Sequence, residues 1–118
     1  MLSFVPSKDT ETIAIEFEGT ATREDALKID KIIQEKFEDK GKFNIYAVIN
    51  GVEDAVFTGL GESMQVNMDA WNQFHKFAVI SSIHLNEQLA EMESLLPKLE
   101  VKHFQMDEMN EAWEWIQE

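Results

Sequence analysis

Hydrophobic residues alternate with polar ones in some stretches of the chain and run without interruption in others. Thr12–Glu18 places Ile13, Ile15 and Phe17 on one side of an extended chain, which is the period-two pattern of a half-buried strand. The uncharged runs 43–49 and 77–81 are rich in β-branched and aromatic residues, as expected for strands covered on both faces. We therefore predict that 43–49 lies at the centre of a sheet. A short edge strand over 2–5 and an outer strand over 99–104 bring the expected number of strands to five.

Apolar positions at helical spacing predict four helices between and after these strands. The first follows Thr22, which resembles the start of a capping box, and the last follows Asp107, which can cap it. The second covers about 63–74, and the third ends before Pro97. The expected buried stripes of the first, third and last helices are Ala26, Ile29, Ile33 and Phe37; Leu85, Leu89, Met92 and Leu96; and Met109, Ala112, Trp113 and Ile116. Strands alternating with helices predict a single-domain α/β fold over 1–118, with a mixed five-stranded sheet and about four helices.

Net charge narrows the classes of partner. The 118 residues include no cysteine and carry a formal charge of −13. Nucleic acids and anionic lipid surfaces bind proteins largely through clusters of Lys and Arg, so neither is an expected partner. Residues 83–118 hold nine acidic and two basic residues, a balance of −7. This excess favours a solvated acidic surface, or an acidic face that steers a basic protein partner. No apolar run approaches the roughly 20 residues of a membrane-spanning helix, and we expect a cytoplasmic protein.

No catalytic arrangement is evident in the sequence. His75, His84 and His103 lack metal-ligand spacing, and the Ser81, Ser82 and His84 group lacks the strained turn of a nucleophilic serine. Gly59-Leu60-Gly61 lacks the third glycine and the lysine of a phosphate-binding loop. We predict a protein that is not an enzyme and has no metal or other cofactor.

Several segments together resemble a known family. They are Gly19 to Asp25, Tyr46 to Ile49, Phe77 to Ile80, Leu99-Glu100-Val101-Lys102-His103-Phe104 and Glu111-Ala112-Trp113-Glu114-Trp115-Ile116. This pattern is similar to that of the SpoIIAA-like proteins, small bacterial proteins with a STAS-type fold. The same fold occurs in anti-sigma-factor antagonists and has been compared with the lipid-binding CRAL-TRIO (SEC14-like) domains. The resemblance implies a five-stranded mixed sheet with about four helices.

A local similarity suggests a regulatory residue. The segment 49–61 resembles the STAS segment in which a strand leads to Asp-Ser-Ser-Gly-Leu-Gly at the start of a helix. In the antagonists that segment carries a regulatory phosphoserine. Here Val56-Phe57-Thr58 occupies the corresponding place, so the resemblance implies Thr58 as the candidate phospho-acceptor. The structural alternative is a tight turn that Gly59 and Gly61 permit.

The expected helix over 63–74 is the main candidate for function. Met64, Met68 and Trp71 recur at i, i+4 and i+7, and Phe74 follows. Such a stripe either fills a core or lines a pocket, because methionine adapts to irregular apolar partners. We predict that a mobile, Met-rich helix covers an apolar or lipid-like small molecule bound by these four residues. The alternative is a STAS-type protein-interaction module that binds a regulatory protein or forms a homodimer. Contact with membranes is expected only as transient apolar insertion.

Overall fold

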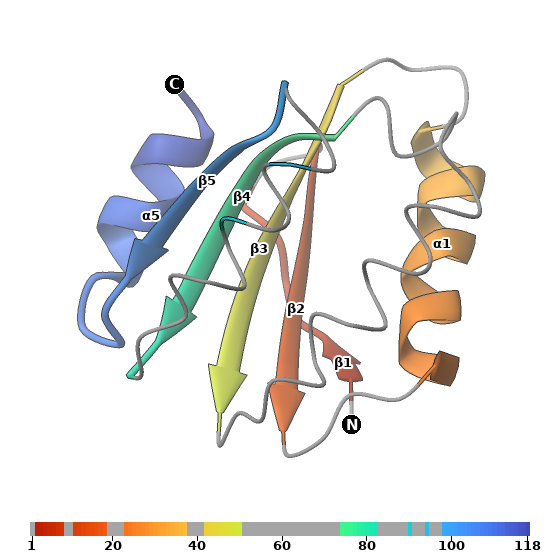
Figure 1. Ribbon diagram of the computed structural model, residues 1–118, viewed down its shortest axis with the longest axis horizontal. Helices are drawn as coiled ribbons and strands as arrows, with labels where there is room; N and C mark the ends of the chain where they lie inside the picture. Colours follow the sequence, from red (N-terminus) through yellow and green to blue (C-terminus); the bar gives the residue numbers. More distant parts are fainter. Residues whose placement is uncertain are drawn as a thin grey trace.

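The protein is built on one five-stranded sheet with strand order β1-β2-β3-β4-β5. The computed structural model describes residues 2–8, 11–18, 23–37, 42–50, 74–82, 90, 94 and 98–118. The strands are β1 (Leu2–Phe4), β2 (Thr12–Glu18), β3 (Phe43–Asn50), β4 (Phe74–Ser81) and β5 (Glu100–Phe104), and the described helices are α1 (Arg23–Phe37) and α5 (Met109–Ile116). Figure 1 shows the strands side by side, with α5 on the side of β5 and α1 on the side of β1.

Strand direction makes the sheet mixed. β1 runs antiparallel to β2, whereas β2, β3, β4 and β5 run parallel to one another. A parallel pair needs a long crossover connection, and α1 supplies it between β2 and β3. The order follows the sequence from one edge to the other, so β3 lies in the middle with all seven residues 43–49 buried. The predicted mixed α/β sheet and its central strand are thus confirmed.

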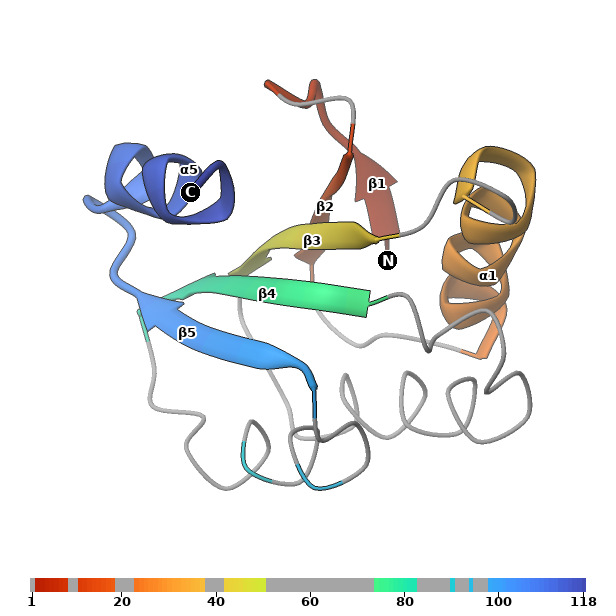
Figure 2. The ribbon, with the colours of Figure 1, turned by 90° about the horizontal axis from the view of Figure 1, so that it is seen from above.

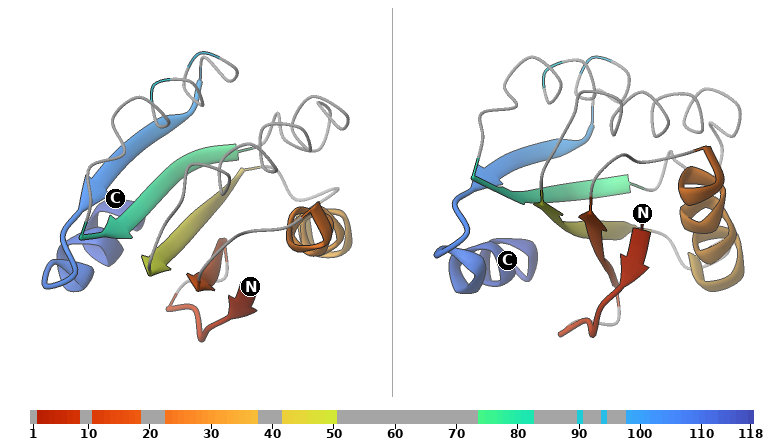
Figure 3. Two further views of the ribbon diagram at one scale, coloured as in Figure 1. Left: turned by 60° about the horizontal axis from the view of Figure 1, so that its bottom comes forward. Right: turned by 90° about the horizontal axis from the view of Figure 1, so that it is seen from below.

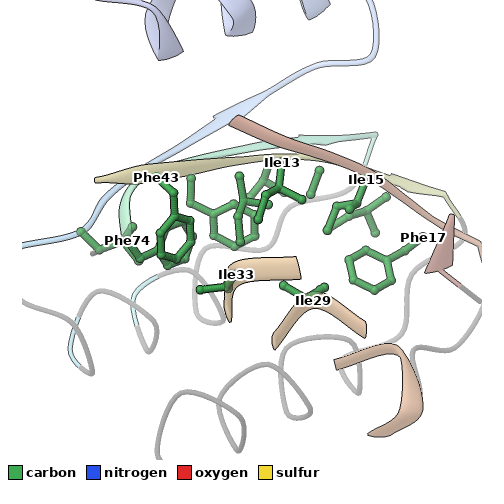
Figure 4. Close-up of a cluster of buried hydrophobic side chains, with 13 residues drawn as sticks. Ile13, Ile15, Phe17, Ile29, Ile33, Phe43 and Phe74 are labelled. Carbon is green, nitrogen blue, oxygen red and sulfur yellow. The ribbon is translucent and has the colours of Figure 1, made fainter. Parts of the chain in front are cut away.

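The two faces of the sheet carry separate hydrophobic clusters because successive side chains of a strand point to opposite faces. Ile29 and Ile33 of α1 pack on the first face, which we call the α1 face. Figure 4 shows these two side chains opposite Ile13, Ile15 and Phe17 of β2. The other members of this cluster are Phe43, Ile45, Ala47, Ile49, Phe74, Phe77, Val79 and Leu99.

Helix α5 covers the opposite face, which we call the α5 face. Its buried residues Ala112, Trp113 and Ile116 were predicted from their spacing, and they pack with Ala14, Tyr46, Val48, Ala78, Ile80 and Phe104. Figures 2 and 3 show α5 beside β3, β4 and β5 rather than beside β1. Among the described residues, no helix is long and apolar enough to cross a membrane.

Several boundaries and the number of described helices differ from the expectations; β1 ends at Phe4 instead of residue 5, and β5 begins at Glu100 instead of residue 99. β4 begins at Phe74, so the expected helix 63–74 does not include that residue, and the expected strand 77–81 was too short. α5 is preceded by Glu108 instead of Asp107, with no side-chain hydrogen bond at the N-cap. The described residues form two helices where about four were predicted. The expected helix over 85–96 and the remainder of 63–74 fall outside the described residues, apart from Ala90 and Ser94.

Candidate functional site

Of the residues predicted to bind an apolar ligand, Phe74 is the one that the structure describes. Met64, Met68, Trp71 and the candidate phospho-acceptor Thr58 lie outside the described residues. Phe74 is 2% exposed and stacks on Phe43, with ring centroids 5.2 Å apart and an interplanar angle of 3°. Its ring is also 5.6 Å from that of Phe77, at 48°. Figure 4 shows Phe43 and Phe74 together at one end of the cluster on the α1 face.

A bulge in β4 explains how Phe74 reaches this face. Phe43 is opposite Phe74 and Asn44 is opposite Lys76, so His75 is an extra residue in β4. Simple alternation counted back from Phe77 would place Phe74 on the α5 face. The extra residue reverses this and directs the ring into the α1-face cluster. Phe74 thus lies in a packed aromatic group formed by the first residues of β3 and β4.

The opposite face contains a row of buried polar side chains that sequence analysis missed. Thr12, Asn44 and Lys76 are neighbours in the register of β2, β3 and β4, and each is between 5 and 6% exposed. Asn44 Nδ2 donates to Thr12 Oγ1 at 3.5 Å, and Asn44 Oδ1 has no hydrogen-bond partner among the described groups. A buried polar atom without a partner costs about 1–3 kcal/mol, so Asn44 Oδ1 is the unfavourable group of this row.

Lys76 connects that row to α5. Its Nζ donates to the backbone oxygen of Trp115 at 2.9 Å and to that of Glu118 at 3.3 Å. The same ammonium lies 5.3 Å from the centroid of the Trp115 ring. The last carbonyl groups of a helix lack intrahelical partners and carry partial negative charge, so a buried cation stabilises them. The signal in the sequence was a lysine at 76, directly before an uncharged run.

An aromatic pair occupies the centre of the α5 face. Tyr46 of β3 and Trp113 of α5 stack with centroids 4.4 Å apart and an interplanar angle of 21°. Burial raises the pKa of Tyr46 above its ordinary value of 10.0, and a hydrogen bond from the Trp113 side chain opposes that shift in part. The phenol therefore remains neutral at physiological pH. Its described contacts are those of a core residue.

The histidines that the structure describes do not converge on a ligand site. His103 Nε2 lies 3.0 Å from the carbonyl oxygen of Ser81, at the ends of β5 and β4. His75 is the extra residue at the start of β4, at the opposite end of that strand. No group of three or more His, Asp or Glu side chains is placed to hold a metal ion in the part of the chain that the structure describes. His84 lies outside that part.

Comparison with known proteins decides the family. The family model for SpoIIAA-like proteins matches residues 12–117, which is nearly the whole chain. The chain belongs to the SpoIIAA-like family. The match begins at the first residue of β2 and ends just after α5, so it contains the four parallel strands and both described helices. No curated protein and no solved structure matches the chain.

Membership in the SpoIIAA-like family confirms the resemblance drawn from the sequence. The mixed five-stranded sheet agrees with the STAS-type fold expected from that resemblance. The family match extends across the segments that contain Thr58, Met64, Met68 and Trp71, but it assigns no role to any of them. The ligand-binding and phospho-acceptor assignments remain predictions.

Proposed function

We propose that this protein is a non-enzymatic regulatory module of the cytoplasm that acts by binding another protein. The family match over residues 12–117 carries this proposal, because it places nearly the whole chain in a family with a STAS-type fold. Such a module needs a stable scaffold and an accessible surface. The two filled faces of the sheet provide the scaffold, with cluster residues that are between 0 and 7% exposed.

The chemistry of the partner follows from the acidic surface. In the described segment 98–118, the exposed acidic residues include Glu100, Asp107, Glu111 and Glu114, whereas Lys98 and Lys102 are the two basic residues. Clustered charge of one sign raises the association rate with a partner of opposite sign and repels partners of like sign. We therefore propose a partner with a basic surface, and binding that weakens as salt is added.

The test is recovery and reconstitution of the complex. The tagged protein is used to isolate partners from its native cells at low and high salt, and each recovered protein is then purified and titrated against it by fluorescence anisotropy. We expect saturable binding to a basic protein, which weakens about tenfold or more between 0.05 and 0.5 M salt. The test variant is the double substitution Glu111→Gln/Glu114→Gln, which removes two exposed charges from α5 and should weaken binding without changing the melting temperature by more than a few degrees. Binding that is indifferent to salt and to these substitutions would contradict the electrostatic part of the proposal.

The hypothesis of an apolar ligand is a second candidate. Phe74 supports it, since this residue directly follows the Met-rich segment and belongs to an aromatic group with Phe43 and Phe77. All three rings are at most 2% exposed, so a ligand that reached them would have to displace existing contacts. Rearrangement of that kind is what a lid hypothesis requires.

The two candidates give different results in one experiment. Purified protein is extracted for bound lipids and titrated with a fatty acid and a hydrophobic dye, in the original sequence and as Met68→Glu. Saturable binding that Met68→Glu abolishes would establish the ligand function, with the thermal stability of the variant as the control for folding. Absence of saturable binding in the original protein eliminates the lid hypothesis and leaves the protein-interaction proposal to be judged by its own test.

A further inference from the structure

β1 is an edge strand of the sheet that the described residues form. It is the first strand in the order, and no other described strand pairs with its outer side. The backbone N–H of Val5 donates to the carbonyl oxygen of Ala14 at 3.0 Å, so Val5 points its backbone groups toward β2. These groups alternate in direction along an antiparallel strand. Ser3 therefore also directs its N–H and C=O toward β2, whereas Leu2 and Phe4 direct theirs outward.

The composition of β1 leaves this edge open to pairing. Exposed sheet edges are commonly protected from other chains by charged side chains. β5, at the other edge, carries the exposed residues Glu100 and Lys102. β1 carries no charge, and its Phe4 ring is 47% exposed. The two edges thus differ: charge protects β5, whereas β1 combines outward backbone groups with an exposed aromatic ring.

The absence of charge on β1 itself allows a second copy of this acidic chain to approach at the β1 edge. Residues 2–8 carry a single basic residue and no acidic one, whereas the described segment 98–118 carries six acidic and two basic residues, a balance of −4. β1 and β5 are separated by four strand spacings, about 19 Å at ~4.8 Å each. That distance exceeds the Debye length of about 8 Å at physiological ionic strength. Figure 1 shows β1 and β5 at opposite edges of the sheet, so two copies joined at β1 would hold the two β5 strands at the far edges of the combined sheet.

We propose that the protein forms a symmetric dimer in which β1 pairs antiparallel with β1 of a second copy. A two-fold axis at Ser3 places Leu2 of each copy opposite Phe4 of the other. The outward N–H and C=O groups of these residues then form four hydrogen bonds. Ser3 faces its counterpart as the non-hydrogen-bonded pair, with Cα atoms about 4.5 Å apart. The exposed Phe4 rings become covered at the seam, and the two sheets continue as one.

Cross-linking at Ser3 tests the register. The chain has no cysteine, so Ser3→Cys introduces a single thiol. A Cα separation of about 4.5 Å falls within the range of about 4.4–6.8 Å that a disulfide spans. Under mild oxidation at micromolar protein concentration, we expect Ser3→Cys to give a covalent dimer in high yield that reducing agent reverses. Ser82→Cys places a thiol at an exposed position after β4 and is the matched control; it should remain largely monomeric.

Sedimentation equilibrium tests the proposed β1–β1 interface without a cross-link. The original protein should show a reversible monomer–dimer equilibrium, and Phe4→Glu should weaken the dimer about 10- to 100-fold, because it removes a covered aromatic ring and introduces two close charges. Met106→Glu is the control, since Met106 is 36% exposed and follows β5, at the opposite edge of the sheet from β1. Circular dichroism confirms that each variant is folded.

Two results would overturn the proposal: a protein that stays monomeric to about 1 mM, or a dimer that Ser3→Cys does not trap and Phe4→Glu does not weaken. Binding of an unrelated extended peptide at β1, without self-association, also overturns it.

Discussion

Tyr46 shows how one buried residue ties the stability of the fold to pH. Its side chain is 4% exposed and stacks on the Trp113 ring, which joins β3 to α5. Burial raises the pKa of Tyr46 in the folded protein, whereas the unfolded chain keeps the ordinary value near 10.0. The folded state therefore binds the phenolic proton more tightly than the unfolded state.

We predict that this difference makes the fold lose stability at alkaline pH. The contribution of the neutral phenol is fully present below pH 10 and declines as the pH rises from there through the raised pKa. Tyr46 is the only tyrosine, so absorbance of tyrosinate near 295 nm reports this residue alone. We expect its titration midpoint above 10 in the folded protein and near 10 in denaturant. The variant Tyr46→Phe should abolish the tyrosine-dependent part of the alkaline loss of stability, and an unchanged alkaline profile in that variant would contradict the assignment.

Helix α5 is the element whose attachment to the sheet can be tested most directly. Lys76 and Lys102 each have Nζ 5.3 Å from an aromatic centroid, of Trp115 and Phe104 respectively. Lys76 is 6% exposed and bonds two carbonyl oxygens near the end of α5, whereas Lys102 is exposed. Both lysines make a cation–π contact, but only Lys76 makes the buried carbonyl contacts. Substituting each lysine in turn therefore separates the effects of the two kinds of contact.

We expect Lys76→Met to lower the free energy of unfolding by about 1–3 kcal/mol, because hydrogen bonds from a charged donor are lost while the apolar stem is kept. Hydrogen exchange of the amides at 115–118 should accelerate in this variant. Lys102→Met, the matched control, should change the free energy of unfolding by less than about 1 kcal/mol. Equal effects of the two substitutions in chemical denaturation would show that the carbonyl contacts of Lys76 contribute nothing of their own.

The same elements show what the sequence could predict. The uncharged run 43–49 predicted a central strand because only a strand covered on both faces tolerates seven buried residues in a row. The spacing of Ala112, Trp113 and Ile116 predicted the buried side of α5. The start of β4 could not be predicted in this way. A strand that begins with Phe-His-Lys and contains a bulge breaks the alternation on which the prediction relied.

The contacts of Lys76 could not be predicted from local sequence patterns either. Its carbonyl partners are 39 and 42 residues away in the sequence, and only the packing of α5 on β4 brings them together. The candidate site was predicted from helical spacing in a segment of which the structure describes Phe74 alone. Phe74 belongs to the aromatic group on the α1 face. This placement was not predicted, because Phe74 was expected to end a helix and instead begins β4.

At the scale of the whole molecule, net charge is the dominant property. A formal charge of −13 on 118 residues produces self-repulsion that opposes the compact state. α5 illustrates this locally at its C-terminal end, where Glu114 lies in the last turn and no basic residue accompanies it. Negative charge near the end of a helix is unfavourable because the terminal carbonyl groups are partly negative.

We therefore predict that added salt stabilises the fold. Raising NaCl from 0.05 to 0.5 M should increase the melting temperature by a few degrees, because the Debye length falls from roughly 14 Å to roughly 4 Å and repulsion between surface carboxylates is screened. Glu114→Gln, which reduces the formal charge from −13 to −12 and removes the acidic residue from the last turn of α5, should melt higher than the original protein at low salt and show a smaller increase with salt.

Salt also distinguishes the interactions proposed for this molecule. Screening should strengthen pairing at the uncharged β1 edge, since it reduces repulsion between two acidic copies, and should weaken binding of a basic partner, since it reduces attraction. Sedimentation and anisotropy measured over the same salt series would then give slopes of opposite sign. Slopes of equal sign would mean that one of the two surfaces has been assigned to the wrong partner, and the response of Phe4→Glu would identify which.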